Sequence, residues 1–380
     1  MAISFALTPE QEEFRAVVHD FAEEVIGPVA DEINAEGRFP TDIVKRMGEL
    51  GLFGIPFEER YGGMDGDFLS LCLAIEEIGR VDQSVGITLE AAVGLGAAPL
   101  HAFGTEEQKR RWLPALCRGE RLGAFGLTEP GGGSDNLGAT ATRAERDGDE
   151  WVINGSKVFI TNAGTDLTSI ITITAWTGDD EMTAIIVPAD TPGLTVAPPY
   201  RKVGWHASDT RELAFADVRV PVDHTLGEVG AGFRQFLRTL DDGRIALAAL
   251  SVGMIQGCVD ECVRYAGERS AFGRRIGGHQ AIAFKIADLE VAAQTARHLW
   301  WNAAWRRAEG LPYKKEASIA KLYASEQAVT AAREATQIFG GYGCMTESRV
   351  GRFYQDAKVL EIGEGTSEIQ RILIARELGL

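Results

Sequence analysis

Basic residues are scarce in this chain relative to acidic ones. Lys and Arg number 38 against 55 Asp and Glu, which gives a formal net charge of −17. Such a charge opposes binding to phosphate backbones and to anionic membranes, so we expect neither nucleic acid nor a membrane as a partner. One basic segment, Arg269 to Arg275, is a candidate contact for a phosphorylated cofactor.

Long apolar runs are also lacking. No stretch of about 18 uncharged apolar residues, the length that spans a membrane, occurs in the chain. Met1 to Glu10 has no basic segment followed by an apolar core, as a secretory signal would. We therefore expect a cytoplasmic protein.

The five cysteines are few and scattered, and their spacing fits no metal site. Cys258 and Cys262 share one helical face, which indicates core packing rather than a metal site or a disulfide. With 380 residues, of which 45% are hydrophobic and 24% charged, the chain is long enough for two or three packed units of a soluble globular protein.

The patterning predicts three domains and a mainly α fold with a central β domain. Residues 1–122 have a helical period after a start signal at Thr8. Residues 123–229 alternate β-branched and polar residues, with hairpin turns predicted at Asn154-Gly155 and Gly178-Asp179-Asp180. Residues 230–380 predict an up-and-down bundle, with long helices over Phe233 to Glu268, Gln280 to Ala308 and Ala317 to Phe339.

Two motifs suggest chemistry, and each has an ordinary alternative. From Leu127 to Asp135, three glycines followed by Ser134 expose several backbone N–H groups, which can bind a phosphate or the polar edge of a ring. A plain flexible loop has the same sequence. Glu90 interrupts an apolar helical segment and would line a pocket if buried, but we favour a position at the solvent-exposed end of a helix.

The segment Val359 to Gln370 places one carboxylate between two glycines. An apolar run, strand-like or loop-like, ends at Gly363, and Thr366 opens a final helix. Held by tight backbone against a ligand, Glu364 can act as a general base. From these residues alone, a solvated acid in the first turn of a helix is the favoured alternative.

The order of the motifs resembles that of one enzyme family. LTEPGGGSD from Leu127, KVFITNA from Lys157 and IGEGTSEIQ from Ile362 follow one another as they do in the acyl-CoA dehydrogenases, and the resemblance covers essentially the whole chain. It implies an N-terminal helical domain, a middle β-barrel or sandwich and a C-terminal four-helix bundle. It also implies bound FAD, oxidation of an acyl-CoA to trans-2-enoyl-CoA, and a catalytic role for Glu364.

The resemblance assigns FAD contacts to the β region and to the loop around Glu364. Leu127 and Thr128 would face the pyrimidine edge of the flavin, while Ser134 would lie near the pyrophosphate and the thioester. Phe159 would stack on the flavin, where many relatives have Trp. The full set is Phe125, Leu127, Thr128, Gly133, Ser134, Phe159, Ile160, Thr161, Thr366 and Glu368.

A second set of implied FAD contacts lies in the bundle and would reach the flavin of a neighbouring subunit. The resemblance therefore implies a homo-oligomer, usually a tetramer. Relatives often have Thr where this chain has Ala271, so one hydrogen bond is missing. For Gly340 and Gly341, the ordinary alternative is a glycine turn that ends a helix. The residues are Arg269, Phe272, His279, Gln280, Gln337, Gly340 and Gly341.

Asp241 and Arg244 match the pair that contacts CoA and steadies the catalytic loop; an exposed ion pair of little energetic weight is the alternative. Some relatives carry their catalytic glutamate immediately before this arginine, where Gly243 stands here, which leaves Glu364 as the base. Its backbone N–H would bind the thioester carbonyl, and burial by the acyl chain would raise its pKa. The implied substrate contacts are Ser134, Asp241, Arg244 and Gly365.

Many relatives have Tyr where this chain has Gly363. Either the missing ring widens the site for branched or bulky acyl groups, or a neighbouring side chain fills the space. We expect short- to medium-chain or branched acyl-CoA substrates and electron-transfer flavoprotein as the electron acceptor. The alternatives are an acyl-CoA oxidase or an acyl-carrier-protein-linked dehydrogenase of the same fold, and a non-catalytic flavin-binding relative. The presence of Glu364, Thr161 and Arg244 argues against the last.

Overall fold

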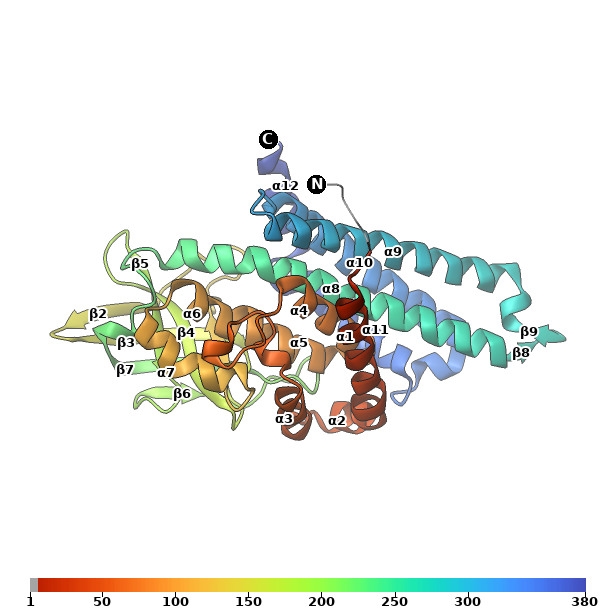
Figure 1. Ribbon diagram of the computed structural model, residues 1–380, viewed down its shortest axis with the longest axis horizontal. Coiled ribbons are helices and arrows are strands. Elements are labelled where there is room, and N and C mark those ends of the chain that lie inside the picture. Colours follow the sequence, from red (N-terminus) through yellow and green to blue (C-terminus); the bar gives the residue numbers. More distant parts are fainter. Residues whose placement is uncertain (1–5) are drawn as a thin grey trace.

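The computed structural model describes residues 6–380. The molecule is elongated, with the strands gathered at one end and long helices running to the other (Figure 1). Residues 1–5, which begin the predicted N-terminal domain and the segment Met1 to Glu10, lie outside the described residues. The predicted fold class, mainly α with a central β region, is confirmed.

The N-terminal region is helical and begins where the sequence predicts. The Gln11 N–H donates to the Thr8 hydroxyl at 3.2 Å, and the Thr8 N–H donates to the Gln11 side chain at 3.0 Å, which completes a capping box. The helices and helical turns are α1 (Pro9–Phe21), η1 (Ala22–Ile26), η2 (Gly27–Val29), α2 (Ala30–Glu36), α3 (Thr41–Glu49), η3 (Leu52–Gly54), η4 (Glu59–Tyr61), α4 (Phe68–Gly79), α5 (Gln83–Glu90), η5 (Ala91–Ala97), α6 (Ala98–Phe103) and α7 (Glu106–Cys117).

The central strands are β1 (Leu122–Gly126), β2 (Arg143–Asp147), β3 (Glu150–Thr161), β4 (Thr168–Trp176), β5 (Met182–Pro188), β6 (Leu194–Val196) and β7 (Thr210–Pro221), followed by the turn η6 (Val222–His224). They form one sheet in the order β1-β4-β2-β3-β7-β6, with β5 paired to β4. The predicted hairpin at Gly178-Asp179-Asp180 is confirmed, because it joins the antiparallel strands β4 and β5.

The second predicted hairpin turn, Asn154-Gly155, is wrong. Strand β3 continues through both residues, and its pairing with β7 shifts register between Ile153 and Gly155. Gly155 has a φ of 150°, and a Cβ there would lie 2.7 Å from the Thr142 Cα. The glycine therefore makes a bulge where another segment approaches closely, not a turn.

The C-terminal region is a helical bundle. Its elements are α8 (Gly232–Glu268), β8 (Ser270–Ala271), β9 (Arg274–Arg275), η7 (Ile276–Gly278), α9 (Gln280–Ala308), α10 (Lys314–Phe339), η8 (Gly340–Cys344), α11 (Arg349–Ile362) and α12 (Ser367–Glu377). The three predicted long helices correspond to α8, α9 and α10. Helix α8 runs from the sheet to the β8–β9 hairpin at the far end of the molecule (Figure 1).

The prediction of a strand-like or loop-like run before Gly363 is wrong, because this run is the end of helix α11. Phe353, Ala357 and Leu360 are each at most 2% exposed. Their spacing of four and three residues is helical, so the apolar residues form one buried face of the helix. Glu364 consequently follows a rigid element of the bundle.

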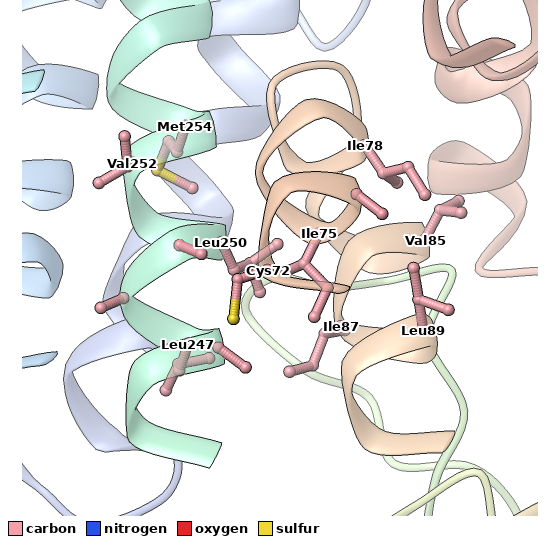
Figure 2. Packing of buried hydrophobic residues seen from close by; sticks show 14 of the residues in the cluster. Cys72, Ile75, Ile78, Val85, Ile87, Leu89, Leu247, Leu250, Val252 and Met254 are labelled. Atoms are coloured by element: carbon pink, nitrogen blue, oxygen red, sulfur yellow. The ribbon is translucent and has the colours of Figure 1, made fainter. Parts of the chain in front are cut away.

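Helices α4, α5 and α8 meet in the main hydrophobic core (Figure 2). A Cβ on Gly79 or on Gly86 would lie 2.7 or 2.5 Å from the Leu250 Cδ1, so the helices approach closely. Within the described residues, the runs Gln83–Phe103 and Gly232–Glu268 are long and apolar enough to cross a membrane, but 78% and 83% of their most apolar windows are buried inside the protein. Such burial is typical of core helices.

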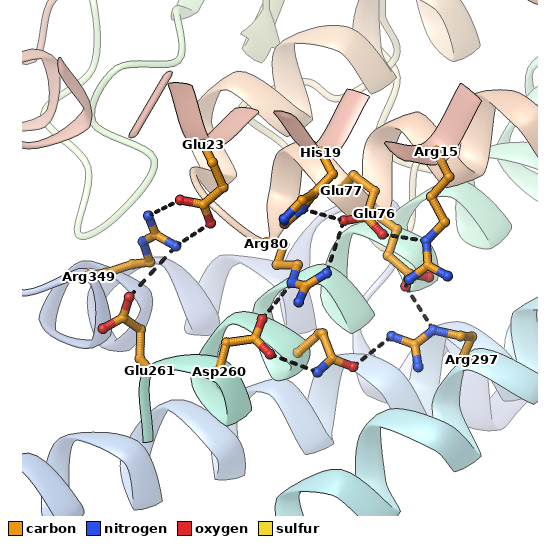
Figure 3. A network of polar contacts seen from close by, with 11 residues as sticks. Arg15, His19, Glu23, Glu76, Glu77, Arg80, Asp260, Glu261, Arg297 and Arg349 are labelled. Atoms are coloured by element: carbon orange, nitrogen blue, oxygen red, sulfur yellow. Dashed lines mark hydrogen bonds and ion pairs between the residues drawn. The ribbon is translucent and has the colours of Figure 1, made fainter. Parts of the chain in front are cut away.

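A network of charged side chains ties α1, α4, α8 and α9 together (Figure 3). At its centre Glu76 is 1% exposed. Its carboxylate accepts hydrogen bonds from Arg297 Nε at 2.8 Å and from Trp300 Nε1 at 3.0 Å. Burial raises the pKa of Glu76, so the charged form depends on these partners.

We expect Arg297→Met to lower the free energy of unfolding by about 3–5 kcal/mol, because it removes the nearest positive charge from a buried carboxylate and leaves, among the described residues, only Arg15, at 3.9 Å. Urea denaturation measures this loss. Arg264→Met in the same bundle is the control: the Arg264 side chain is 56% exposed, and its ion pairs with Glu261 and Glu268 contribute at most about 1 kcal/mol. Equal losses in the two variants would contradict the buried role of Glu76.

Candidate active site

Glu364 lies in the short turn between α11 and α12. Its φ is 53° and that of Gly365 is 98°, so a non-glycine residue is held in the left-handed region. Thr366 caps α12, with the Ile369 N–H donating to its hydroxyl at 3.3 Å, as the sequence predicts. Both carboxylate oxygens of Glu364 are shielded from solvent. Backbone strain of this kind persists only where the surroundings impose it.

The favoured position of Glu90, at a solvent-exposed helix end, is wrong. Helix α5 does not end at the surface but continues directly into η5, and Glu90 is 0% exposed. Its carboxyl group lies against that of Glu364, and burial together with the charge of Glu364 raises the pKa of Glu90 well above its usual range. A Cβ on Gly94 would lie only 3.0 Å from Glu90 Oε1. Glu90 therefore lies in a tightly enclosed site that is shielded from solvent.

The surroundings assign different protonation states to the two carboxyl groups. Burial raises the pKa of Glu364, but a hydrogen bond from Glu90 and the charges of Arg244 and Lys321 act in the opposite direction. Among residues 6–380, no positive charge lowers the pKa of Glu90 in this way. Two adjacent buried carboxylates cannot both be ionised. Glu90 therefore holds the proton, and Glu364 is the carboxylate able to accept one.

Arg244 and Asp241 pair on helix α8, but the alternative of an exposed ion pair is wrong. The two side chains are 5% and 19% exposed. Burial lowers the pKa of Arg244, and its Nε has no partner among the described residues. A Cβ on the neighbouring Gly243 would overlap Glu364 Oε2 and lie 2.8 Å from its Cδ. The glycine thus provides the space that the Glu364 carboxylate occupies.

The glycine loop after β1 is anchored by a buried ion pair that sequence reasoning missed. Lys157 Nζ donates to Glu129 Oε1 at 2.7 Å and to the Leu127 carbonyl at 3.3 Å. The Glu129 carboxylate also accepts the N–H of Ala141 at 2.6 Å, and Thr142 donates to it as well. Burial lowers the pKa of Lys157 to about 8. Both ends of the loop are fixed to β3, while the tip at Gly133 and Ser134 is exposed.

Phe159 is placed as the aromatic platform of this region. Its ring is 65% exposed and its φ is 61°, so strained backbone directs a large apolar ring outward. Thr161 ends the same strand. The exposed ring and the loop of backbone N–H groups fit a cofactor with a flat ring and phosphates, as FAD has.

Three predicted FAD contacts have side chains engaged elsewhere. Ile160 packs inside the sheet at 2% exposure. The Phe125 ring stacks on Phe236 with centroids 3.9 Å apart. The Thr366 hydroxyl caps α12. Only the backbone or the remaining surface of these three residues is free to contact a cofactor, whereas Glu368 is exposed on α12.

The second predicted set lies far from the first within one chain. Phe272, at the tip of the β8–β9 hairpin, is 97% exposed, and this hairpin is at the end of the molecule opposite the sheet (Figure 1). His279 contacts the Ala271 carbonyl at 3.2 Å, which shapes the hairpin. Arg269, Gly340 and Gly341 line a groove of about 490 Å³ beside it. Gln280 and Gln337 are exposed nearby.

Two further residues of the catalytic turn carried no predicted role. Lys321 on α10 is 0% exposed and donates to the Gly365 carbonyl. The signal was present in the sequence, since Lys321 interrupts a helical stripe of small residues at Ala317, Ala324 and Ala328. Gln370 is the last residue of the IGEGTSEIQ motif, which begins at Ile362. Among residues 6–380, no group of three or more His, Cys, Asp or Glu side chains forms a metal site.

Gly363 has a φ of −57° and a ψ of 146°, which any residue adopts, so the turn itself does not require glycine. A Cβ there would lie 3.9 Å from the Trp205 ring and 4.0 Å from Leu247. Trp205 is 7% exposed, and its backbone N–H donates to Asp356 at 2.5 Å. The space next to Gly363 is therefore bounded by a fixed indole ring.

Comparison with known proteins gives one consistent family. Models of the acyl-CoA dehydrogenase N-terminal, middle and C-terminal domains match residues 8–120, 124–218 and 230–379. A probable acyl-CoA dehydrogenase of Bacillus subtilis, YngJ, is 50% identical over 379 residues, covering 99% of this chain and 100% of that protein.

Solved structures agree with this result. Butyryl-CoA dehydrogenase from Megasphaera elsdenii superposes with a TM-score of 0.96 at 40% identity, covering 100% of both chains. A chain from a structure described as the electron transferring flavoprotein of Acidaminococcus fermentans gives a TM-score of 0.96 at 40% identity, covering 99% of both chains. Matches of this extent define an oxidoreductase. The chain belongs to the acyl-CoA dehydrogenase family.

Proposed function

We propose that the protein oxidises short- to medium-chain or branched acyl-CoA thioesters to trans-2-enoyl-CoA, with Glu364 as the base that removes the α-proton. The observation that carries this proposal is the pair of buried carboxyl groups, in which Arg244 and Lys321 favour the ionised form of Glu364. The similarity to butyryl-CoA dehydrogenase supports a short acyl chain.

The residues of the chain have separable tasks in this reaction. The Glu364 backbone N–H donates to the thioester carbonyl and stabilises the enolate-like charge that develops when the α-proton leaves. The proton moves to the Glu364 carboxylate, whose raised pKa makes it a stronger base than a solvated glutamate. Asp241 and Arg244 hold the CoA moiety. FAD, where bound, supplies the acceptor for the β-hydrogen, which leaves as hydride.

The FAD site proposed here is shared between subunits. The glycine loop and Phe159 of one chain hold the flavin, and the hairpin with Phe272 of another completes the site. An aromatic ring that is 97% exposed supports this arrangement, since large apolar surfaces mark contact sites. We propose a homotetramer in the cytoplasm, with electron-transfer flavoprotein as acceptor; the similarity to a chain from a structure bearing that name supports the acceptor.

Anaerobic titration of the FAD-bound protein with straight and branched acyl-CoAs tests the proposed function. We expect bleaching of the flavin absorbance by butyryl-CoA or a branched analogue. Absence of bleaching with every thioester, acyl-carrier-protein thioesters included, would contradict dehydrogenation. Oxygen consumption without an added acceptor would identify an oxidase instead.

We expect Gly363→Tyr to lower the ratio of branched to linear activity by about tenfold, since a ring added beside Trp205 takes up space next to the reacting carbons. The measurement is kcat/KM for isobutyryl-CoA and butyryl-CoA in both proteins. An unchanged ratio would show that the indole already fills the space that the missing ring leaves.

A further inference from the structure

The Lys321 amine is buried and, among the described residues, makes no direct ion pair with a carboxylate. Lys321 is 0% exposed on α10, and its Nζ donates to the Gly365 carbonyl at 2.8 Å. Among residues 6–380, no carboxylate oxygen lies within 4.0 Å of this nitrogen. Burying an ammonium group is costly unless it is paired and hydrogen-bonded. An apolar side chain would pack in this helix without that cost, so the amine requires another explanation.

The same carbonyl accepts a second buried donor. Gln370 on α12 is 0% exposed, and its Nε2 donates to the Gly365 carbonyl at 2.9 Å and to the Glu364 carbonyl at 3.4 Å. Side chains from two different helices therefore converge on the turn that carries the base. The backbone of Glu364 and Gly365 is in the left-handed region, so these contacts are what hold the strained turn in place.

We propose that Lys321 and Gln370 are positioning residues for the base. Both fix the peptide that follows Glu364, and the positive charge of Lys321 also favours the carboxylate form of Glu364. The inference rests on the proposed function, because it assumes that Glu364 accepts the α-proton. The two residues differ in one respect. Both fix the geometry of the turn, but only Lys321 also places a positive charge near Glu364.

Several charged groups surround the Lys321 amine and affect the pH at which it loses its proton. Burial lowers the pKa of Lys321 to about 8, and the nearby charges act on it in opposite directions. The negative groups favour the ammonium form and Arg244 opposes it. Glu90, from α5, is neutral as argued above. The charged groups facing Lys321 are Glu364, Arg244, Glu361 and Glu326.

The experiment compares Lys321→Met, Gln370→Met and the double variant in the FAD-bound protein. We expect Lys321→Met to slow flavin reduction by butyryl-CoA about 100-fold, the effect of displacing a reacting group by about 1 Å. We expect its acid limb in the pH–rate profile to move up by about one pH unit, because a positive charge near Glu364 is lost. Gln370→Met slows reduction without moving the acid limb. In the double variant, the fold-loss in the reduction rate is smaller than the product of the two single losses, since both side chains donate to the same carbonyl.

A readout independent of activity is amide hydrogen exchange across residues 361–370. We expect exchange to be about tenfold faster in both single variants, because the turn loses a restraint. Lys315→Met is the control, with the same substitution on the same helix at a side chain that is 39% exposed. It leaves the rate, the acid limb and the exchange unchanged.

Unchanged reduction, acid limb and exchange in a folded Lys321→Met protein would overturn the inference while leaving the proposed function intact. If Lys321→Met does not fold, the Gln370→Met variant provides the test. A normal rate of flavin reduction and normal hydrogen exchange in that variant would contradict the claim that the two side chains hold the turn. Failure of the unmodified protein to reduce its flavin with any thioester would instead remove the proposed function, and the inference with it.

Discussion

Glu364→Gln lowers the rate of flavin reduction by butyryl-CoA by about 10³-fold, within the range that general bases contribute. The amide keeps the size of the side chain and the strained turn but cannot accept the α-proton. Asp241, Arg244 and the backbone still hold the ligand, so the Kd of butyryl-CoA stays within about threefold. Stopped-flow absorbance under anaerobic conditions measures the rate, and equilibrium titration measures the Kd.

The matched control is Glu377→Gln, the same substitution at an exposed position of α12, where the side chain is 40% exposed and lies 3.6 Å from Lys314. It leaves the rate unchanged. A Glu364→Gln protein that retained a tenth or more of the rate would mean that another group takes the proton. Glu90 is the carboxyl group next to it, and the double variant Glu90→Gln with Glu364→Gln would identify that group.

Gly243→Ala lowers the rate by about 100-fold although it adds only a methyl group. A Cβ at this position would overlap Glu364 Oε2, so the carboxylate must move away from the α8 backbone. A shift of about 1 Å in a reacting group has an effect of this size. The measured quantities are the rate of flavin reduction and the pH–rate profile, which reports whether the carboxylate has left its charged partners.

Gly267→Ala in the same helix is the control for this substitution. Nothing lies within 4 Å of a Cβ there, so the change raises the free energy of unfolding by up to about 1 kcal/mol and does not alter the rate. A Gly243→Ala protein with normal turnover would show that the carboxylate does not depend on the space beside Gly243.

Local signals predicted most of the fold. The capping box at Thr8 and the turn at Gly178-Asp179-Asp180 act through neighbours in the chain, and both are confirmed. The prediction of a turn at Asn154-Gly155 was wrong because the pairing of β3 with β7 determines the backbone conformation there. The prediction of a strand or loop before Gly363 was wrong for a similar reason. Tertiary packing determines the secondary structure of a short apolar run, and here the run packs as a helix.

The site was less accessible from sequence than the fold. Whether Glu90 is solvated or buried depends on how α5 continues and on what packs around it, and neither is a property of its neighbours in the chain. The alternative of an exposed ion pair for Asp241 and Arg244 is wrong for the same reason, because the exposure of the two side chains depends on how helix α8 packs. The importance of Glu364 came from the family resemblance. The contacts of Lys321 and Gln370 with the Gly365 carbonyl depend on tertiary packing, which the sequence signal at Lys321 did not reveal.

The pH dependence of single-turnover flavin reduction, in the unmodified protein and in Glu364→Gln, tests the identity of the base most directly. The pKa of Glu364 is raised, so the rate of the unmodified protein falls as the pH drops through that raised value and the carboxylate becomes protonated. The residual rate of the variant is flat over the same range. The same acid limb in both proteins would assign the titrating group elsewhere and contradict Glu364 as the base.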